Sequence, residues 1–262
     1  MEQFSADFQR QYPSEDAAKI EATLRTLTAQ KVDSIDIRTI SEVAGTPSKL
    51  FTLLQVGLRR VIDLSEAGVR EMNRQRVVPA IVLVRAVFET SCLMFDAVRQ
   101  ADKAANTGTM QAVVEYDKYL MDAMFGSKSK EWSGGAEAEE YATRNVLTIM
   151  QRLAKEMNSE LMWFYNGLSE HAHPNYLGMS SIYQVISDTP HDPIVRFSDS
   201  ALEARETPMR LALRCLEIAT TIMLVSLQQY IGGRNAIAAV CEKALYDAGT
   251  WPAEVTYPVK RD

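Results

Sequence analysis

Apolar residues recur along most of this chain at the three- and four-residue spacing of amphipathic helices, and they alternate only in short stretches. The clearest stripe runs from Leu50 to Leu64, after Thr46 as the expected N-cap and Pro47 as the expected first helical residue. Residues 78–100 are apolar on every side, which is typical of a central, buried helix. The pattern therefore predicts an all-α protein.

Six or seven helices are expected in total. Their predicted ranges are 15–31, 50–72, 78–100, 109–125, 136–171 at its longest, 208–231 and 235–248. Four of them are long, and these are predicted to form the core of a helical bundle: 50–72, 78–100, 136–171 and 208–231. Pro208 is expected to open the sixth helix, and Gly232 and Gly233 are expected to close it.

The segment 174–207 differs in character from the rest of the chain. It holds three prolines and two extended-looking runs, SIYQVIS and PIVRFSD, which predict a small β-hairpin between helices. The predicted organisation is an N-terminal helix and linker (1–45), a helical bundle domain (46–250) and an extended tail (251–262).

Composition and charge narrow the classes of function. The 262 residues are 47% apolar and 24% charged, the profile of an ordinary soluble globular protein. The net charge of −6 and the lack of a basic block argue against a general nucleic-acid binder. No run of 18 uncharged apolar residues and no signal peptide are found, and three widely separated cysteines lie in apolar surroundings, so a cytoplasmic protein without a membrane span is predicted.

Familiar cofactor motifs are missing from the sequence. There is no GxGxxG, P-loop, HExxH or CxxC pattern, so no cofactor is predicted. The stretch GTPSKL (45–50) has the letters of a phosphate-binding loop but no preceding strand. A capped helix start with proline explains it better.

Two charges, Arg85 and Glu89, lie on an otherwise apolar face of the helix 78–100. Arg85 and Glu89 are four residues apart, so their side chains meet on one face of the helix. A charge moved alone into a core costs several kcal/mol unless it is paired. The pair is therefore either an internal ion pair that fixes helix register or part of a polar pocket.

The second polar cluster is NGLSEHAHPN (166–175), which holds two of the three histidines. Pro174 disfavours helix at the residue before it, so the helix is expected to end near His173. Asn166, Ser169 and His173 fall on neighbouring faces, and His171 adds a group that titrates near neutral pH. Such a set suits metal binding, general acid–base chemistry or the polar floor of a ligand site.

The helix with RAVFE (85–89), followed about 80 residues later by YNGLSEHAHPN (165–175), resembles the bacterial DUF5677 family over about residues 50–230. That family is counted near the HEPN helical-bundle proteins, whose ribonucleases carry an Arg-x4–6-His motif at a helix end. The resemblance implies a catalytic histidine with an arginine that stabilises phosphate charge. Counting back from His171 or from His173 reaches Asn166 instead, which lacks the cationic fork of arginine.

We therefore predict a HEPN-like bundle in which one polar pocket forms between helices 78–100 and 136–171. Its expected catalytic residues are His171, Arg85 and Glu89, and its expected ligand-binding residues are Tyr165, Asn166, Ser169, His173 and Asn175.

Three functions remain open for this pocket. The first is a non-catalytic or weakly catalytic ligand- or partner-binding protein of bacterial stress or defence, which needs no metal or cofactor. The second is an RNA-cleaving nuclease with His171 as base and Arg85 as electrophile. The third is a metal-dependent hydrolase that uses Glu89, His171 and His173. A homodimer is expected, with RNA or another protein as a further partner and no membrane association.

Overall fold

The computed structural model describes most of the chain, namely residues 2–41, 43–126, 141, 143–180, 183–186, 194–197 and 202–253. The tail predicted for 251–262 therefore lies mostly outside the described residues, as do residues 136–140 of the predicted fifth helix.

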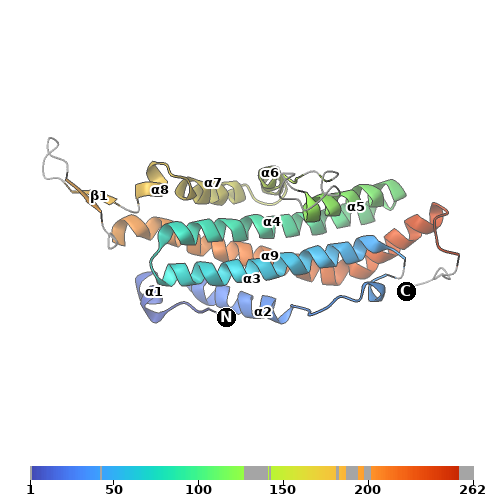
Figure 1. Ribbon diagram of the computed structural model, residues 1–262, viewed down its shortest axis with the longest axis horizontal. Coiled ribbons are helices and arrows are strands. Elements are labelled where there is room, and N and C mark those ends of the chain that lie inside the picture. Colours follow the sequence, from blue (N-terminus) through green and yellow to red (C-terminus); the bar gives the residue numbers. More distant parts are fainter. Residues whose placement is uncertain are drawn as a thin grey trace. The chain divides into compact units, whose positions relative to one another are not determined.

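The described residues are mainly helical, which confirms the predicted helical class, but they form nine α-helices rather than six or seven (Figure 1). The elements are α1 (Ala6–Gln11), α2 (Glu15–Ala29), the 3-10 helix η1 (Ile37–Thr39), α3 (Gly45–Asn73), α4 (Val77–Thr107), α5 (Met110–Phe125), α6 (Val146–Glu156), α7 (Glu160–Ala172), α8 (Tyr176–Ser180), β1 (Tyr183–Ile186), β2 (Ile194–Phe197) and α9 (Leu202–Asp247).

Several helix ends lie where the sequence places them. The Ser14 side chain accepts a hydrogen bond from the Asp16 backbone N–H at the start of α2. The Thr109 hydroxyl accepts one from the Ala112 N–H at the start of α5, and Gly126 follows the end of that helix. These side chains satisfy backbone groups that a helix terminus otherwise leaves without partners.

The start of α3 differs from its prediction. The helix already begins at Gly45, so Thr46 lies inside the first turn and is not its N-cap. The hydroxyl of Thr46 instead donates to the Oδ1 atom of Asp117 on α5, at 2.8 Å. Pro47 still falls in the first turn, where its missing N–H costs no helix bond.

The single helix predicted for 136–171 is wrong, because the chain forms α6 and α7 with a break at residues 157–159. The side chain of Asn158 accepts a hydrogen bond from the Glu160 backbone N–H at 2.9 Å, and so offers the backbone a partner outside the helical ladder. Met157 belongs to the predicted apolar stripe but is 47% exposed. The stripe therefore does not pass through this point, and no burial opposes the break.

The separate helices predicted for 208–231 and 235–248 are also wrong, because α9 continues through Pro208, Gly232 and Gly233. Pro208 lies in the second turn of α9, where it removes only one hydrogen bond. Tyr230, Ile237 and Cys241 are all buried, so the apolar face of α9 passes across the two glycines. Burial of that face outweighs about 1 kcal/mol of helix propensity lost per glycine.

The segment after α8 contains the two short strands β1 and β2. They pair antiparallel, with Tyr183 opposite Phe197 and Ile186 opposite Ile194 (Figure 1). This two-stranded sheet precedes α9 in the chain.

The chain divides into two compact units, and α3, α4 and α9 each contribute one segment to both. Unit 1 comprises Met1–Gln30, Arg59–Cys92 and Met150–Ile222, and unit 2 comprises Lys31–Leu58, Leu93–Ile149 and Met223–Asp262. The core of unit 1 contains apolar side chains from α2, α3, α4, α7 and α9, among them Ile20, Leu24, Leu27, Ile62, Met72, Ile81, Val84, Phe88, Leu168, Leu213 and Leu216.

Unit 2 combines an apolar core with several buried polar groups. The Phe51 and Tyr230 rings stack at 5.2 Å and join α3 to α9. Asp96 is 1% exposed and accepts a hydrogen bond of 2.6 Å from the Tyr119 hydroxyl, which joins α4 to α5. Arg144 donates to the buried carboxylate of Asp122 at 2.8 Å. Each of these carboxylates leaves water only together with a partner.

Two described helices, α4 and the segment Arg205–Asp247 of α9, are long and apolar enough to cross a membrane by length and composition. Half of the apolar window of each is buried within the protein, and core helices of soluble proteins meet the same criterion. The absence of a membrane span and the cytoplasmic location therefore stay predictions.

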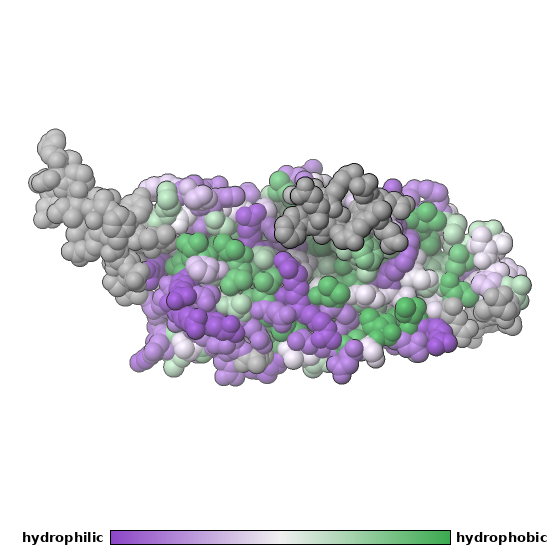
Figure 2. Space-filling view, in the orientation of Figure 1, coloured by the Kyte–Doolittle hydropathy of each residue, from purple (hydrophilic) through white to green (hydrophobic). Residues whose placement is uncertain are grey.

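Exposed hydrophobic side chains are distributed over several elements. On the face drawn in Figure 2 they form patches separated by hydrophilic residues. Independently of that view, the exposed large side chains of the described residues include Val56 on α3, Val114 on α5, Trp163 on α7 and Tyr176 on α8. Single exposed apolar residues are usual on protein surfaces, so none of these residues indicates a site by itself.

Two glycines of unit 2 should respond oppositely to alanine. A Cβ on Gly232 would meet no atom within 4 Å, so Gly232→Ala should stabilise the protein by about 0.5–1 kcal/mol through helix propensity. The side chain of buried Met94 fills the space beside Gly57, so Gly57→Ala must displace that side chain and should destabilise the protein by about 1 kcal/mol. Thermal unfolding followed by circular dichroism measures both, and a higher midpoint for Gly57→Ala would contradict the packing of Met94 against Gly57.

Candidate functional site

The structure brings Arg85, Glu89 and Tyr165 together in unit 1. Arg85 donates from Nε to the Oε1 atom of Glu89 at 3.0 Å and from Nη2 to the hydroxyl oxygen of Tyr165 at 3.1 Å. The Tyr165 hydroxyl donates in turn to the same Oε1 atom at 3.1 Å. The three side chains thus form a closed hydrogen-bonded triangle between α4 and α7.

This triangle is partly accessible to water. The side chains of Arg85 and Glu89 are 26% and 30% exposed, and the Arg85 guanidinium also lies 5.3 Å from the centre of the Tyr165 ring. Burial lowers the pKa of Arg85, but the hydrogen bond and charge of Tyr165 and the charge of Glu89 outweigh it and raise the pKa. Arg85 therefore stays a cation whose charge is matched within the group.

Helix α7 is positioned by close packing and by its own polar C-terminus. A Cβ on Gly167 would lie 3.0 Å from Leu211, so the glycine allows α7 to approach α9. The helix ends before His173, whose backbone N–H bonds to the Ser169 carbonyl. A Cβ on Gly178 would lie 1.8 Å from the His173 carbonyl oxygen, so only glycine fits where α8 turns back onto this end.

Asn175, predicted to bind ligand, has a local structural role. Its Oδ1 atom accepts a hydrogen bond from the Gly178 N–H at 2.9 Å, and its Nδ2 atom donates to Glu170 at 2.7 Å. Both ends of the amide are therefore occupied by the turn between α7 and α8. This local bonding leaves Asn175 less suited to contact a ligand.

The other predicted site residues on α7 do not join the triangle through a hydrogen bond or ion pair between described residues. Asn166 is exposed, while Ser169 and His171 are half-buried and His173 is exposed. The Ser169 hydroxyl oxygen lies one turn beyond Tyr165 and is buried, and no other described residue forms a hydrogen bond with it. The structure thus joins Arg85, Glu89 and Tyr165 by hydrogen bonds, and it places neither histidine among them.

The arrangement of acidic, histidine and cysteine side chains bears on the metal interpretation. Among the described residues, no three of these side chains lie close enough together to hold a metal ion. Glu89, His171 and His173 all belong to the described residues, so the ligand set of the metal-dependent alternative is not assembled. The carboxylate of Glu89 instead accepts hydrogen bonds from Arg85 and Tyr165.

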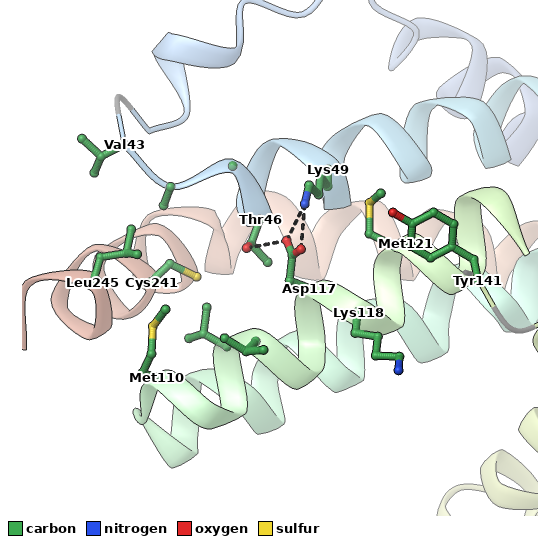
Figure 3. A pocket seen from close by; sticks show the side chains of 14 residues that line it. Val43, Thr46, Lys49, Met110, Asp117, Lys118, Met121, Tyr141, Cys241 and Leu245 are labelled. Atoms are coloured by element: carbon green, nitrogen blue, oxygen red, sulfur yellow. Dashed lines mark hydrogen bonds and ion pairs between the residues drawn. The ribbon is translucent and has the colours of Figure 1, made fainter. Parts of the chain in front are cut away.

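A cavity of about 490 Å³ lies within unit 2, between α3, α5 and α9 (Figure 3). Most of its wall is apolar and comes from Val43, Ala44, Met110, Val113, Val114, Met121, Cys241 and Leu245. The remaining lining residues are Gly45, Thr46, Lys49, Asp117, Lys118 and Tyr141. A space of this size, mainly apolar with a few convergent polar groups, is typical of small-molecule sites.

The polar groups of the cavity are organised around Asp117. Its Oδ1 atom accepts hydrogen bonds from the Thr46 hydroxyl and the Lys49 ammonium, both at 2.8 Å, and its Oδ2 atom accepts one from Lys49 at 2.7 Å. Figure 3 shows Asp117 pointing from α5 toward Thr46 and Lys49 on α3. The Asp117 cluster, meaning these three residues, therefore gives one wall of the cavity a fixed set of charges.

The chain leading into α3 forms another wall and is anchored to α9. The Ser41 hydroxyl donates to the buried carboxylate of Glu242 at 2.8 Å and accepts from the backbone N–H groups of Val43 and Ala44. Burial, with the charges of nearby carboxylates, raises the pKa of the neighbouring Cys241 to about 12. Its thiol stays protonated near neutral pH, and Cys241 serves as a small apolar lining residue rather than a nucleophile.

The sequence interpretation missed this site, although it singled out one part of it. GTPSKL (45–50) contributes Gly45, Thr46 and Lys49 to the cavity wall, although no strand precedes it and α3 starts there. Asp117 is about 70 residues away, on α5, and no local motif connects it to Lys49. The signal that could have located the site was the pair Thr46 and Lys49, which lie in one turn at the start of a helix with an apolar face.

Comparisons of this chain with family models, with curated proteins and with solved structures found no match. The resemblance to the DUF5677 and HEPN groups therefore stays a prediction.

The triangle of Arg85, Glu89 and Tyr165 should respond non-additively to substitution. Tyr165→Phe should cost about 1.5 kcal/mol of unfolding free energy, because it removes the hydroxyl that bonds to a guanidinium and to a carboxylate, while Arg85 and Glu89 keep their own bond. Arg85→Met should cost about 2 kcal/mol because it leaves the Glu89 carboxylate half-buried without its cation. The double variant Arg85→Met/Glu89→Leu should cost less than the sum of its single variants. Denaturant unfolding measures Tyr165→Phe, Arg85→Met, Glu89→Leu and the double variant. Strict additivity of the two single changes in the double variant would contradict the pairing.

Proposed function

We propose that this protein is a non-catalytic small-molecule-binding protein whose ligand occupies the cavity between α3, α5 and α9 of unit 2. The observation that carries the proposal is the cavity itself, about 490 Å³ of mainly apolar space beside the Asp117 cluster. Pockets of this size and lining bury most of a metabolite-sized ligand, and a few fixed polar groups orient it.

The organisation of the cavity wall supports binding rather than chemistry. Asp117 is saturated by Thr46 and Lys49, so it is not a free general base. Cys241 is held as a thiol by its raised pKa, so it is not an activated nucleophile. The wall thus offers shape and charge, which are the requirements of a binding site.

The nuclease alternative has weaker support. It requires a histidine base next to a cation that is free to meet a phosphate. Arg85 is engaged by Glu89 and Tyr165, and no hydrogen bond connects it to His171. A HEPN-like relationship stays part of the proposal on sequence grounds only, through the RAVFE and YNGLSEHAHPN stretches, as do a homodimer and a role in bacterial stress or defence.

The cavity should bind the neutral fluorescent probe N-phenyl-1-naphthylamine, whose emission rises in apolar surroundings. Val114 lines the cavity and is 48% exposed, so Val114→Trp should fill its mouth without entering the core. We expect this variant to weaken probe binding about tenfold, equivalent to about 1.4 kcal/mol. A fluorescence titration of the full-length chain gives the dissociation constants.

Val56→Trp is the matched control. Val56 is 59% exposed on α3 of the same unit and does not line the cavity, so its replacement should leave the affinity within about twofold, less than 0.5 kcal/mol. Equal effects of the two tryptophans, or no saturable binding by the wild type, would refute the proposed site.

Incubation with RNA distinguishes the binding protein from the nuclease. We expect the wild type to leave a mixed-sequence RNA intact, because Arg85 is held away from phosphate chemistry by its two partners. His171→Ala and Arg85→Met proteins serve as matched samples, analysed on the same denaturing gel. Cleavage by the wild type that is lost in both variants would overturn the non-catalytic proposal.

A further inference from the structure

We infer that the ligand of this cavity is an amphipathic monoanion, with an apolar body and a single carboxylate head group that binds at Lys49. This inference rests on the proposed function, because it names the ligand class of the same cavity. Four features carry it: the charges of the wall, the remaining donor of Lys49, the apolar opposite wall and the start of α3.

The charge of the lining is positive although the protein as a whole is acidic. The lining contains two lysines, Lys49 and Lys118, and one acidic residue, Asp117, so the lining residues carry one net positive charge, against −6 for the whole chain. The buried carboxylate of Glu242, next to Cys241, lies behind the lining and already accepts a hydrogen bond from Ser41. Lys118 is exposed and makes no ion pair with described residues, and in Figure 3 it extends away from Asp117. A cationic wall on an acidic protein favours an anionic ligand over a cationic one.

The donors of the Asp117 cluster are not exhausted. An ammonium group has three N–H donors. Among the described residues, Lys49 donates two hydrogen bonds, one to each oxygen of Asp117, so one donor remains. The Lys49 and Asp117 side chains remain 35% and 30% exposed, so a head group can reach them from the cavity. One carboxylate oxygen would complete the coordination of Lys49 without displacing Asp117.

The first turn of α3 adds to this preference. Gly45 and Thr46 line the cavity at the N-terminus of a 29-residue helix. The helix dipole places partial positive charge there, and it acts on the same part of the wall as Lys49. A cationic head group would meet repulsion from this helix terminus, and it would have to compete for Asp117, which already accepts hydrogen bonds from Thr46 and Lys49.

The apolar wall explains why the anion should carry a hydrophobic body. Met110, Leu245 and Cys241 lie on the side of the cavity away from Lys49 (Figure 3). Methionine side chains are unbranched and adapt to bodies of different shape. A small inorganic anion would leave this surface without contact, so the wall fits an alkyl or aryl chain.

Three eight-carbon probes with different head groups test the inference: octanoate, 1-octanol and octylammonium. Each is titrated against the full-length protein loaded with N-phenyl-1-naphthylamine, and displacement of the fluorescence gives its affinity. We expect octanoate to bind about tenfold more tightly than 1-octanol, and octylammonium to bind most weakly.

Variants then locate the preference. Lys49→Met should remove the advantage of octanoate over 1-octanol when both affinities are measured on the same variant. Because this change leaves Asp117 without its cation, Lys49→Met/Asp117→Asn removes both charges together and should give the same loss in a protein with balanced burial. Lys243→Met is the charge-matched control, since Lys243 pairs with Asp247 on α9 and does not line the cavity.

The outcomes separate the inference from the proposed function. If the neutral probe and 1-octanol bind but octanoate binds no better, or octylammonium binds best, the anion preference is wrong and the cavity remains a ligand site. If neither the neutral probe nor any eight-carbon compound binds, both proposals fail. An octanoate preference that survives in both Lys49 variants would also overturn the inference.

Discussion

The need to pair every charge that leaves water is the constraint on which this structure depends. Apolar residues supply the helical stripes, but most charges between the helices are matched across elements: Arg85 and Glu89 of α4 with Tyr165 of α7, Asp96 of α4 with Tyr119 of α5, and Lys49 of α3 with Asp117 of α5. An unpaired charge would cost several kcal/mol at the buried Asp96 and about 2 kcal/mol at the partly exposed positions of Glu89 and Asp117. Each pair therefore selects one way for its two helices to meet, as well as adding stability.

Helical class and several helix ends could be predicted because they depend on local chemistry. Ser14 and Thr109 cap their helices through bonds to residues two and three positions away. Two features could not be predicted: the interruption at Asn158 and the continuity of α9 through Gly232. Each depends on whether neighbouring side chains are buried. Met157 is exposed and Ile237 is buried, although both continue an apolar pattern.

The two candidate sites also differ in how far the sequence could predict them. The approach of Arg85 and Glu89 was predictable, since they lie one helical turn apart. Tyr165, about 80 residues further along the chain, was expected beside them because of the stretch YNGLSEHAHPN. Tyr165 does bond to both residues, but among the described residues neither histidine of that stretch forms a hydrogen bond with them. The cavity in unit 2 gave no local signal, because its charged pair is made by α3 and α5 and its volume is a property of packing. The two polar groups also differ in what adjoins them: the triangle closes on itself, whereas the Asp117 cluster faces space.

The segment that leads into α3 gives the cavity a wall of a particular kind. Val43 and Ala44 precede the helix and have no place in a helical ladder, and the Ser41 hydroxyl holds them through two backbone N–H groups while it bonds to Glu242. Detachment of this wall requires the loss of a few hydrogen bonds and not the unfolding of a helix. This wall should therefore open locally on a timescale much shorter than that of global unfolding, which would let the cavity change its shape while the helices stay folded.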